Sequence, residues 1–148
     1  MPNWCYNRVE ISGEPEEMDE FRELVKSKKS AFDFNEIIPM PKELEDSVSG
    51  SESAKPIWQK KRSKELIEKY GADNWYRWCV DNWGVKWNVT LSEEQDVQDE
   101  GDYLQYTFDT AWGPPYEIYN ALAKKFPDMS ISWFFDEPGM QFAGYLNE

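Results

Sequence analysis

The sequence predicts an α+β fold in which two helices cover an antiparallel sheet and a helical, tryptophan-rich segment is inserted. Three patterns lead to this prediction. Apolar and polar residues alternate near both ends of the chain, as in half-buried strands. Two segments carry apolar residues at helical spacing, and residues 31–84 separate them with a different composition. We therefore expect one domain, 1–148, with residues 31–84 as a helical insertion within it.

The first strand covers residues 3–12, and its two faces differ. One face carries Cys5, Asn7, Val9 and Ile11, and the other carries Trp4, Tyr6, Arg8 and Glu10. Pro15 then begins a helix whose carboxylate-rich first turn complements the positive end of the helix dipole. The buried stripe of this helix consists of Met18, Phe21, Leu24 and Val25.

The insertion is expected to begin with a short strand, because Phe32 and Phe34 alternate with Asp33. Residues 42–55 are rich in Ser and Glu and indicate an exposed loop. A helix follows from Pro56 to Tyr70 and is ended by Gly71. Its inward face should consist of Trp58, Leu66, Ile67 and Tyr70.

Asp73 is the expected N-cap of a second inserted helix, which Gly84 ends. Apolar residues lie almost all round this helix, so it should be buried between layers. They are Trp75, Tyr76, Trp78, Cys79, Val80 and Trp83.

Alternation resumes at residues 86–91, which predicts a strand paired with the one that begins at Leu104. The connection, residues 92–102, is acidic and longer than a common hairpin loop. Asp96, Asp99 and Asp102 lack the ligand spacing of a helix–loop–helix calcium site, so we expect a solvated acidic tip and no metal.

The C-terminal part reads strand, helix, strand, turn, strand. Leu104, Tyr106 and Phe108 alternate, and Pro115 then begins a helix that Pro127 ends. A strand of alternating residues from Met129 to Phe135 follows, with a type II turn expected at residues 136–139 and a last strand at residues 140–146.

Without the insertion, the element order is βαββαβ with an additional C-terminal edge strand, which is the ferredoxin-like order. One face of such a sheet is open. Here both faces carry aromatic residues, since Trp4 and Tyr6 point away from Cys5 and Val9. We therefore expect the tryptophan-rich insertion to fold back as a cover on the open face.

Several segments together resemble the YubB-type ferredoxin-like proteins of phages, prophages and plasmids. They are Met1 to Asn7 with Val9, Ile11 and Gly13; residues 37–41; Trp83-Gly84 with Lys86-Trp87-Asn88; Ala111-Trp112 with Pro114-Pro115; and Glu137-Pro138-Gly139 with Phe142-Ala143-Gly144. The resemblance implies a ferredoxin-like fold and a mobile-element origin, and it implies no activity, cofactor or catalytic residue.

The net charge of −13 argues against ordinary nucleic-acid binding, which needs a positive surface. Residues 73–148 alone hold four Lys or Arg and 14 Asp or Glu, a net charge of −10. Such acidity serves solubility. An alternative is that it mimics nucleic acid and so antagonises a host DNA-binding or defence protein.

The residues that carry chemistry indicate a non-enzymatic protein. The chain has no histidine, the commonest general base, and its two cysteines, Cys5 and Cys79, are expected to be buried. A carboxylate-based hydrolase is a second alternative, because Asp109, Asp136 and Glu137 lie at strand ends where they would be able to converge. We expect no cofactor.

We predict a protein-binding accessory module that contacts a host or mobile-element protein in the cytoplasm, since neither a signal peptide nor a membrane span is visible. The candidate partner-binding residues are Asn3, Trp4, Trp83, Lys86, Trp87, Trp112 and Glu137. The alternative is that these tryptophans only hold the insertion against the sheet. A homodimer through the C-terminal edge strand is a further expectation.

Overall fold

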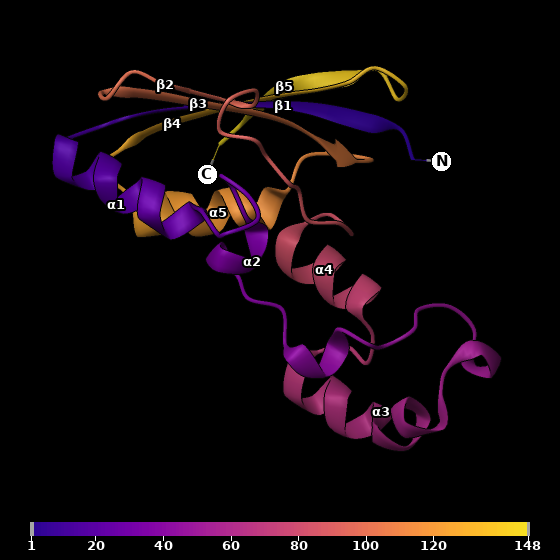
Figure 1. Cartoon of the computed structure of the whole chain (residues 1–148). Coiled ribbons are helices and arrows are strands. Elements are labelled where there is room, and N and C mark those ends of the chain that lie inside the picture. The colour runs from indigo at the N-terminus through magenta and orange to yellow at the C-terminus, as the bar shows by residue number, and fades with distance from the viewer. Residues whose placement is uncertain (1, 148) are drawn as a thin grey trace.

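The computed structural model describes residues 2–147 and contains a five-stranded antiparallel sheet. The strands are β1 (Trp4–Ser12), β2 (Val97–Asp99), β3 (Tyr103–Ala111), β4 (Ser130–Glu137) and β5 (Phe142–Leu146). Their order across the sheet is β2-β3-β1-β4-β5, so the first strand in sequence is the central one. This is the predicted ferredoxin-like arrangement with its additional strand β5 at one edge (Figure 1).

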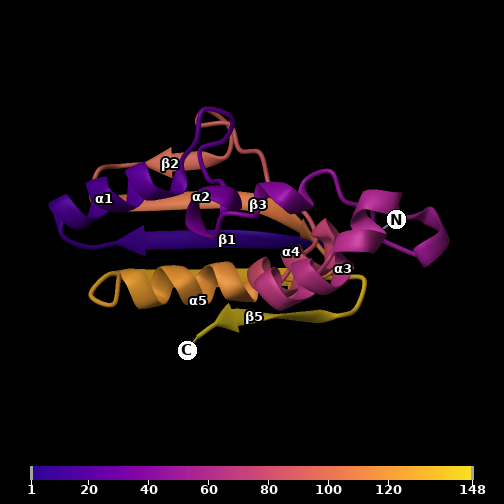
Figure 2. The same cartoon turned by 90° about the horizontal axis from the view of Figure 1, so that it is seen from below.

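Two helices, α1 (Pro15–Val25) and α5 (Tyr116–Lys125), lie side by side across one face of the sheet (Figure 2). The core lies between them and the sheet. Alternation decides which side chains enter it, so β1 contributes Cys5, Val9 and Ile11, all at most 1% exposed. The predicted faces of β1 and β3 and the buried stripe of α1 are thus confirmed, except that Leu24 is only partly buried.

The insertion consists of short helical elements on the same side of the sheet as α1 and α5. These are α2 (Phe34–Ile37), the 3₁₀ turns η1 (Lys42–Leu44) and η2 (Glu52–Ala54), α3 (Ile57–Tyr70) and α4 (Trp75–Trp83). They extend away from the sheet, with α3 the most distant (Figure 1). The prediction that the insertion covers the open face is therefore wrong.

The reason is that the aromatic residues of the insertion have partners on the helical side. Trp83 is 3% exposed, and its indole N–H donates to the Ile38 carbonyl over 2.8 Å. At the end of α4, Gly84 adopts φ +90°, and a Cβ there would lie 2.7 Å from the Tyr116 nitrogen at the start of α5. This close approach fixes the insertion to the helical layer instead of the open face.

The open face of the sheet is a mixture of aromatic and polar side chains. Tyr6 is 39% exposed and Tyr145 57% exposed. Tyr145 packs on Phe134, with ring centroids 5.3 Å apart, and the Arg8 guanidinium lies 4.9 Å from the centre of the same Phe134 ring. Contact with Tyr145 and Arg8 covers part of the Phe134 ring without an additional layer, whereas Tyr6 and Tyr145 stay exposed.

The predicted strand at residues 86–91 does not form, and the predicted acidic loop contains strand β2 instead. The reason is that residues 88–91 are bonded to the insertion. The Leu91 carbonyl accepts the Ala31 N–H over 3.1 Å, the Leu91 N–H donates to the Ser30 hydroxyl, and Asn88 donates to the Asp33 carboxylate. These bonds hold the segment off β3, and β2 pairs with residues 104–106 in its place.

Three local predictions are also corrected. Phe34 begins helix α2 and is not in a strand, because the Asp33 carboxylate caps that helix by accepting the Asn35 N–H over 2.9 Å. The N-cap of α4 is Asn74, which accepts the Arg77 N–H. The β4–β5 turn is not type II, since its positive φ occurs at Gln141 and not at Gly139.

Helix α3 ends at Gly71 as predicted, but its inward face differs from the prediction. Ile67 is 49% exposed and Trp58 37% exposed, whereas Gln59 is fully buried beside Leu66. The Gln59 amide exchanges hydrogen bonds of 2.8 Å with both backbone groups of Val48 and donates to the Asp73 carbonyl. Helix α4 is also less buried than predicted, with Tyr76 42% exposed.

Across residues 2–147, none of the helices combines the length and the hydropathy that a membrane span requires.

Candidate partner-binding surface

Trp4, Lys86 and Trp87 form a cluster at the end of the sheet where β1 starts and β3 stops. The Trp4 and Trp87 ring centroids are 6.0 Å apart and tilted by 33°. The Lys86 ammonium lies 4.2 Å from the centre of the Trp87 ring and 5.9 Å from that of Tyr76. Trp4 is 49% and Trp87 41% exposed, so both rings offer apolar area to solvent. Exposed aromatics beside a cation are typical of protein interfaces.

Each tryptophan of this cluster is positioned by a different part of the fold. Trp4 is opposite Ala111 in the β1–β3 ladder and belongs to the sheet. Trp87 precedes Asn88, whose side chain accepts the Phe34 N–H over 2.9 Å and donates to Asp33 over 2.7 Å. The cluster therefore forms where the sheet and the insertion meet.

Trp112 extends the exposed aromatic area around the end of the sheet. It is 49% exposed, and its backbone has φ +72°, which is unfavourable for a residue with a Cβ. Its N–H donates to the Asn3 carbonyl over 2.8 Å, which continues the β1–β3 ladder by one pair. A strained backbone that points a large ring outward is a feature often found at functional sites.

Two of the predicted partner-binding residues, Trp83 and Glu137, are buried instead. Trp83 is part of the core beneath α4. Glu137 is fully buried, and one carboxylate oxygen accepts the Met140 N–H across the β4–β5 turn. The other oxygen lies next to Gly139 and the side chain of Asn3, and it is buried without a hydrogen-bond partner. At 3% and 0% exposure, these two side chains offer almost no area to a partner.

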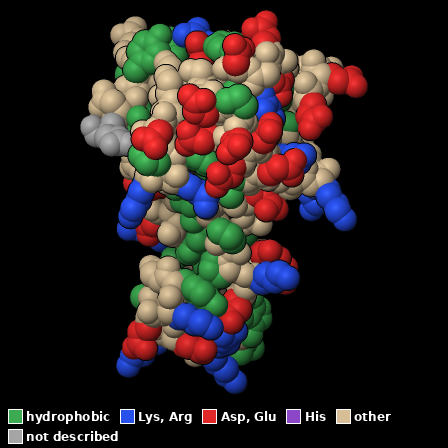
Figure 3. All heavy atoms as spheres, turned by 90° about the vertical axis from the view of Figure 1, so that its left-hand side faces the viewer, with side chains coloured by type: hydrophobic (Ala, Val, Ile, Leu, Met, Phe, Trp, Pro, Cys, Tyr) green, Lys and Arg blue, Asp and Glu red, His purple; other side chains and the backbone are tan. Residues whose placement is uncertain are grey.

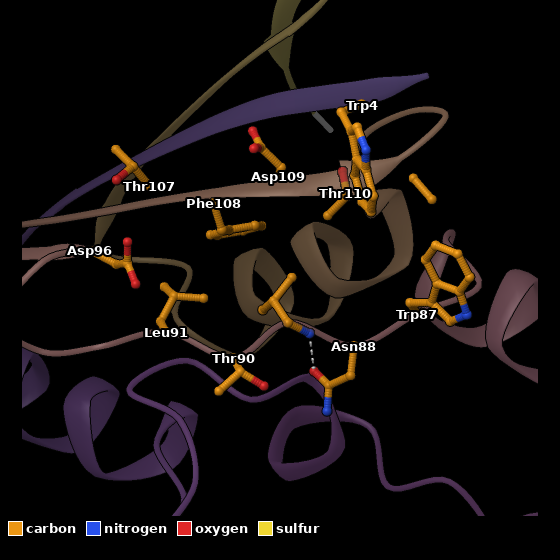
Figure 4. A pocket seen from close by; sticks show the side chains of 12 residues that line it. Trp4, Trp87, Asn88, Thr90, Leu91, Asp96, Thr107, Phe108, Asp109 and Thr110 are labelled. Carbon is orange, nitrogen blue, oxygen red and sulfur yellow. Dashed lines mark hydrogen bonds between the residues drawn. The ribbon is translucent and has the colours of Figure 1, made fainter. Parts of the chain in front are cut away.

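Two grooves flank the Trp87 segment. The first, about 330 Å³, lies between β3 and residues 88–91 (Figure 4). Trp4 and Trp87 stand near one end, and Asp96 lies at the other, with Phe108 pointing into the space between them. The second groove, about 340 Å³, lies between Trp87 and helix α4.

The carboxylates considered for catalysis do not converge. Tyr6 stands between Asp109 and Asp136 in the ladder, so these two side chains are two strands apart, roughly 10 Å, on the open face. Glu137 points to the opposite face from its neighbour Asp136. The arrangement does not bring Asp136 and Glu137 together as a catalytic pair.

Two acidic residues of the 92–102 segment have structural roles. Asp96 accepts the Ser92 N–H, and Asp99 forms a bidentate pair with Arg22 of α1 at 2.7 and 2.8 Å. The Arg22 guanidinium lowers the pKa of Asp99 despite partial burial. Among residues 2–147, no group of three or more His, Cys, Asp or Glu side chains is arranged to hold a metal ion.

Both cysteines are buried, as predicted, and each is a free thiol. Burial raises the pKa of Cys5 to about 11 and that of Cys79 to about 12. Neither thiol has the ionised form that nucleophilic chemistry requires near neutral pH.

Comparison with known proteins connects this geometry to one group. Residues 86–147 match the family model described as the ferredoxin-like domain in Api92-like protein. The match covers β2 to β5 with α5, the second half of the fold. No curated protein matches the chain.

A solved structure resembles nearly the whole chain. The crystal structure of a protein api92 from Yersinia pseudotuberculosis is 13% identical in sequence, with a TM-score of 0.55 over 98% of this chain and 93% of that one. At this identity the likeness concerns the fold alone. It includes the insertion, so the ferredoxin-like sheet with its helical insertion is an architecture that Api92 shares.

Sequence patterns did not reveal three parts of the surface. Tyr76 was expected to be buried, and its contact with Lys86 depends on how α4 lies against the segment that follows it. Asp109 was considered only as a catalytic acid. The first groove was not expected because residues 86–91 were assigned to a strand paired with β3. The two arrangements are separated by bonds between residues far apart in sequence, those of Asn88 to Asp33 and Phe34 and those of Leu91 to Ser30 and Ala31.

Proposed function

We propose that this protein is a non-catalytic protein-binding module that a mobile element encodes and that acts in the cytoplasm of the host. The observation that carries the proposal is the exposed cluster of Trp4, Lys86 and Trp87, extended by Trp112. An exposed aromatic cluster of this kind costs solubility unless a partner covers it for part of the time. The buried thiols and the separated carboxylates also favour binding over catalysis.

The test is affinity capture from host cells with the tagged chain and two matched variants. Trp87→Ala removes a ring that is 41% exposed in the cluster, and Trp58→Ala removes a ring that is 37% exposed on the distant helix α3. Truncation of a central interface tryptophan costs at least about 2 kcal/mol, roughly thirty-fold in affinity. A partner that is captured by wild type and Trp58→Ala and lost with Trp87→Ala supports the proposal. Equal capture by all three proteins contradicts it.

A second candidate function rests on the acidic surface. The sheet and its two helices carry most of the acidic side chains seen in Figure 3, whereas acidic and basic side chains are mixed on the insertion. Arg22 joins the acidic helix α1 to the acidic 92–102 segment. We propose as the alternative that this surface mimics nucleic acid and binds a basic host protein.

The two candidates differ in their response to salt. Binding of a nucleic-acid mimic should weaken steeply between low and physiological salt and should be competed by DNA. Binding through the aromatic cluster should depend on Trp87 and weaken less steeply with salt, because few charges take part in it. Measuring the affinity of the captured partner at several salt concentrations, with and without DNA, separates them.

A further inference from the structure

Strand β3 has an unpaired backbone edge inside the first groove. The Trp112 N–H bonds to β1, and the Thr107 N–H points to the other side, where it bonds to the Asp96 carbonyl over 3.0 Å. Because backbone groups alternate in an antiparallel ladder, Asp109 and Ala111 point the same way as Thr107. Strand β2 reaches only as far as the pair Val97 and Tyr106, so in the described chain no strand faces Asp109 and Ala111.

The neighbouring segment cannot fill this edge without breaking its own bonds. Residues 88–91 run along the groove, but Leu91 is bonded to Ala31 and Ser30, and Asn88 is bonded to Asp33 and Phe34. These bonds hold the segment against the insertion. The groove of about 330 Å³ lies where an additional strand would stand.

The edge also lacks two of the features by which natural sheets block strand addition. Residues 107–111 contain neither proline nor lysine, the residues by which natural sheets most often protect an edge. The groove is instead lined by two carboxylates, Asp96 and Asp109, and by the exposed rings of Trp4 and Trp87. The charge favours a basic ligand, and the rings favour one with an apolar side chain.

We propose that the groove binds an extended, basic segment of a partner protein, which adds to β3 as a strand. This inference rests on the proposed protein-binding function and specifies its mode. The added segment lies antiparallel to β3, in line with β2, and exchanges backbone hydrogen bonds with Asp109 and Ala111. It must leave the sheet before Thr107, whose N–H is already bonded to Asp96.

The ladder determines which side chains the segment should carry. The residue opposite Asp109 lies on the open face beside that carboxylate, so Lys or Arg is favoured there. The residue opposite Ala111 lies on the same face beside Trp4, so an apolar or aromatic side chain is favoured. In an antiparallel segment these two residues are separated by one other residue. From the N- to the C-terminus of the segment, the order is therefore apolar, any residue, basic.

The test uses a synthetic probe and the whole chain. The probe is an acetylated, amidated peptide of threonine, tryptophan, threonine, lysine and threonine, with a fluorescent label for anisotropy. Tryptophan should stand opposite Ala111 and lysine opposite Asp109. Methylating the backbone nitrogens of these two residues should weaken binding at least about ten-fold, because it removes two interchain hydrogen bonds. Methylating the middle threonine, whose N–H points away from β3, should leave the affinity unchanged.

Two variants of the protein complete the design. Ala111→Pro removes the outward N–H while breaking no bond within the sheet, so the fold should persist and the affinity should fall. Asp109→Lys should reject the lysine probe and accept one with glutamate in its place. Amide exchange measured by NMR on the wild type with saturating probe gives an independent readout, in which Asp109 and Ala111 should become protected.

The outcomes separate this inference from the proposed function. Strand addition is wrong if the peptide methylated at tryptophan and lysine binds as tightly as the peptide methylated at the middle threonine. It is also wrong if the protection from amide exchange appears at β5 instead of β3. The proposed function stands on its own if a cellular partner depends on Trp87 but still binds Ala111→Pro with unchanged affinity, and strand addition is then wrong. A cellular partner lost with both Trp87→Ala and folded Ala111→Pro supports both.

Discussion

Asn7 is a fully buried amide that joins three strands through side-chain bonds. Its nitrogen donates to the Cys5 carbonyl over 3.1 Å and to the Thr110 hydroxyl over 2.9 Å, and its oxygen accepts the Trp133 indole N–H over 3.0 Å. The Asn7 oxygen is therefore the hydrogen-bond acceptor for an indole N–H that has no access to water. In the sequence Asn7 occupied a core position of an alternating strand, and its polarity had no explanation there.

We predict that Asn7→Leu lowers the free energy of unfolding by about 1–3 kcal/mol, because the Trp133 N–H loses its acceptor while the side-chain volume is kept. Urea denaturation followed by circular dichroism measures the change. Gln98→Leu, an exposed amide on β2, is the control and should stay within about 0.5 kcal/mol of wild type. An Asn7→Leu protein as stable as wild type would show that the indole finds another acceptor.

Trp112 and Trp133 allow a surface tryptophan to be compared with a core tryptophan. Glycine adopts positive φ without the penalty of roughly 1–2 kcal/mol that a side chain pays. We predict that Trp112→Gly does not lower the melting temperature, since relief of this strain offsets the lost contacts of a ring that is 49% exposed. Trp133→Ala removes a fully buried ring and should lower it sharply. Differential scanning calorimetry of both variants decides between a binding and a packing role for Trp112.

Gly84 and Gly71 form a natural pair for testing how the insertion is attached. Both end a helix at positive φ, but a Cβ at Gly84 meets the Tyr116 nitrogen, whereas a Cβ at Gly71 meets nothing within 4 Å. Gly71→Ala should cost about 1 kcal/mol from backbone strain alone. We predict that Gly84→Ala costs clearly more, measured by urea denaturation, because α4 must also move away from α5. Equal costs would mean that the contact is not tight.

At the scale of the elements, α3 is connected to α4 by a small polar network around Asp73. The carboxylate accepts from the Ser63 hydroxyl over 2.6 Å and the Asn74 amide over 3.0 Å, and it pairs with Lys55 at 3.3 Å. Burial opposes its charge, but these hydrogen bonds and Lys55 outweigh that effect and lower the pKa of Asp73. The network replaces the apolar face that the sequence led us to expect on α3.

We predict that acid loosens the insertion through Asp73. Its pKa is lower in the folded state, so its contribution is complete above the unfolded pKa of about 3.9 and is lost as the pH falls through the folded value. Tryptophan fluorescence, to which Trp75 and Trp78 of α4 contribute, provides the signal for a pH titration. In Asp73→Asn the contribution is absent at every pH, so the stability difference from wild type should vanish at the acid end. A difference that stays constant down to pH 2 would contradict the prediction.

Strands β1, β3, β4 and β5 were predictable from sequence, whereas β2 and the contacts of the insertion were not. In β1, β3 and β4 each side chain faces either the core or the open face, and period-2 alternation records that choice directly. In the insertion, polar side chains such as Gln59, Asp33 and Asn88 carry the contacts, and their partners are distant in sequence. Hydrophobic periodicity contains no information on such bonds. For this reason the predicted inward face of α3 is wrong, and the predicted strand at residues 86–91 is also wrong.

The candidate surface was predictable to a similar degree. The tryptophans Trp4, Trp87 and Trp112 were selected from short motifs, and they do lie at one end of the sheet. Trp83 was selected for the same reason but is buried, because its indole bonds to Ile38. A motif shows that a residue matters, and only the packing shows whether its ring faces the interior or the solvent.

At the scale of the whole molecule, the sheet has two free edges with different properties. One is the β3 edge in the groove, and the other is β5, which carries Tyr145 at 57% exposure on one face and Phe142 at 38% on the other. The ladder alternation places the backbone of Ala143 and Tyr145 on the outside of β5. The homodimer through this strand stays a prediction.

We predict that Ala143→Pro reduces self-association and leaves peptide binding at β3 intact, whereas Ala111→Pro does the reverse. Both prolines replace an outward N–H, so neither should break the sheet. The charge of −13 makes copies repel each other, so self-association should increase with salt. Sedimentation equilibrium at two salt concentrations measures it. A wild-type chain that remains monomeric at high protein and salt concentration would exclude the β5 dimer.

The groove beside Trp87 has one wall from the sheet and one from the insertion. Strand β3 belongs to the sheet, and residues 88–91 are bonded to the 30–34 segment that leads into α2. A ligand bound in this groove would contact both β3 and residues 88–91. It would therefore stiffen the connection between the sheet and the insertion. The proposed ligand would in this way link the sheet to the segment that leads into the insertion.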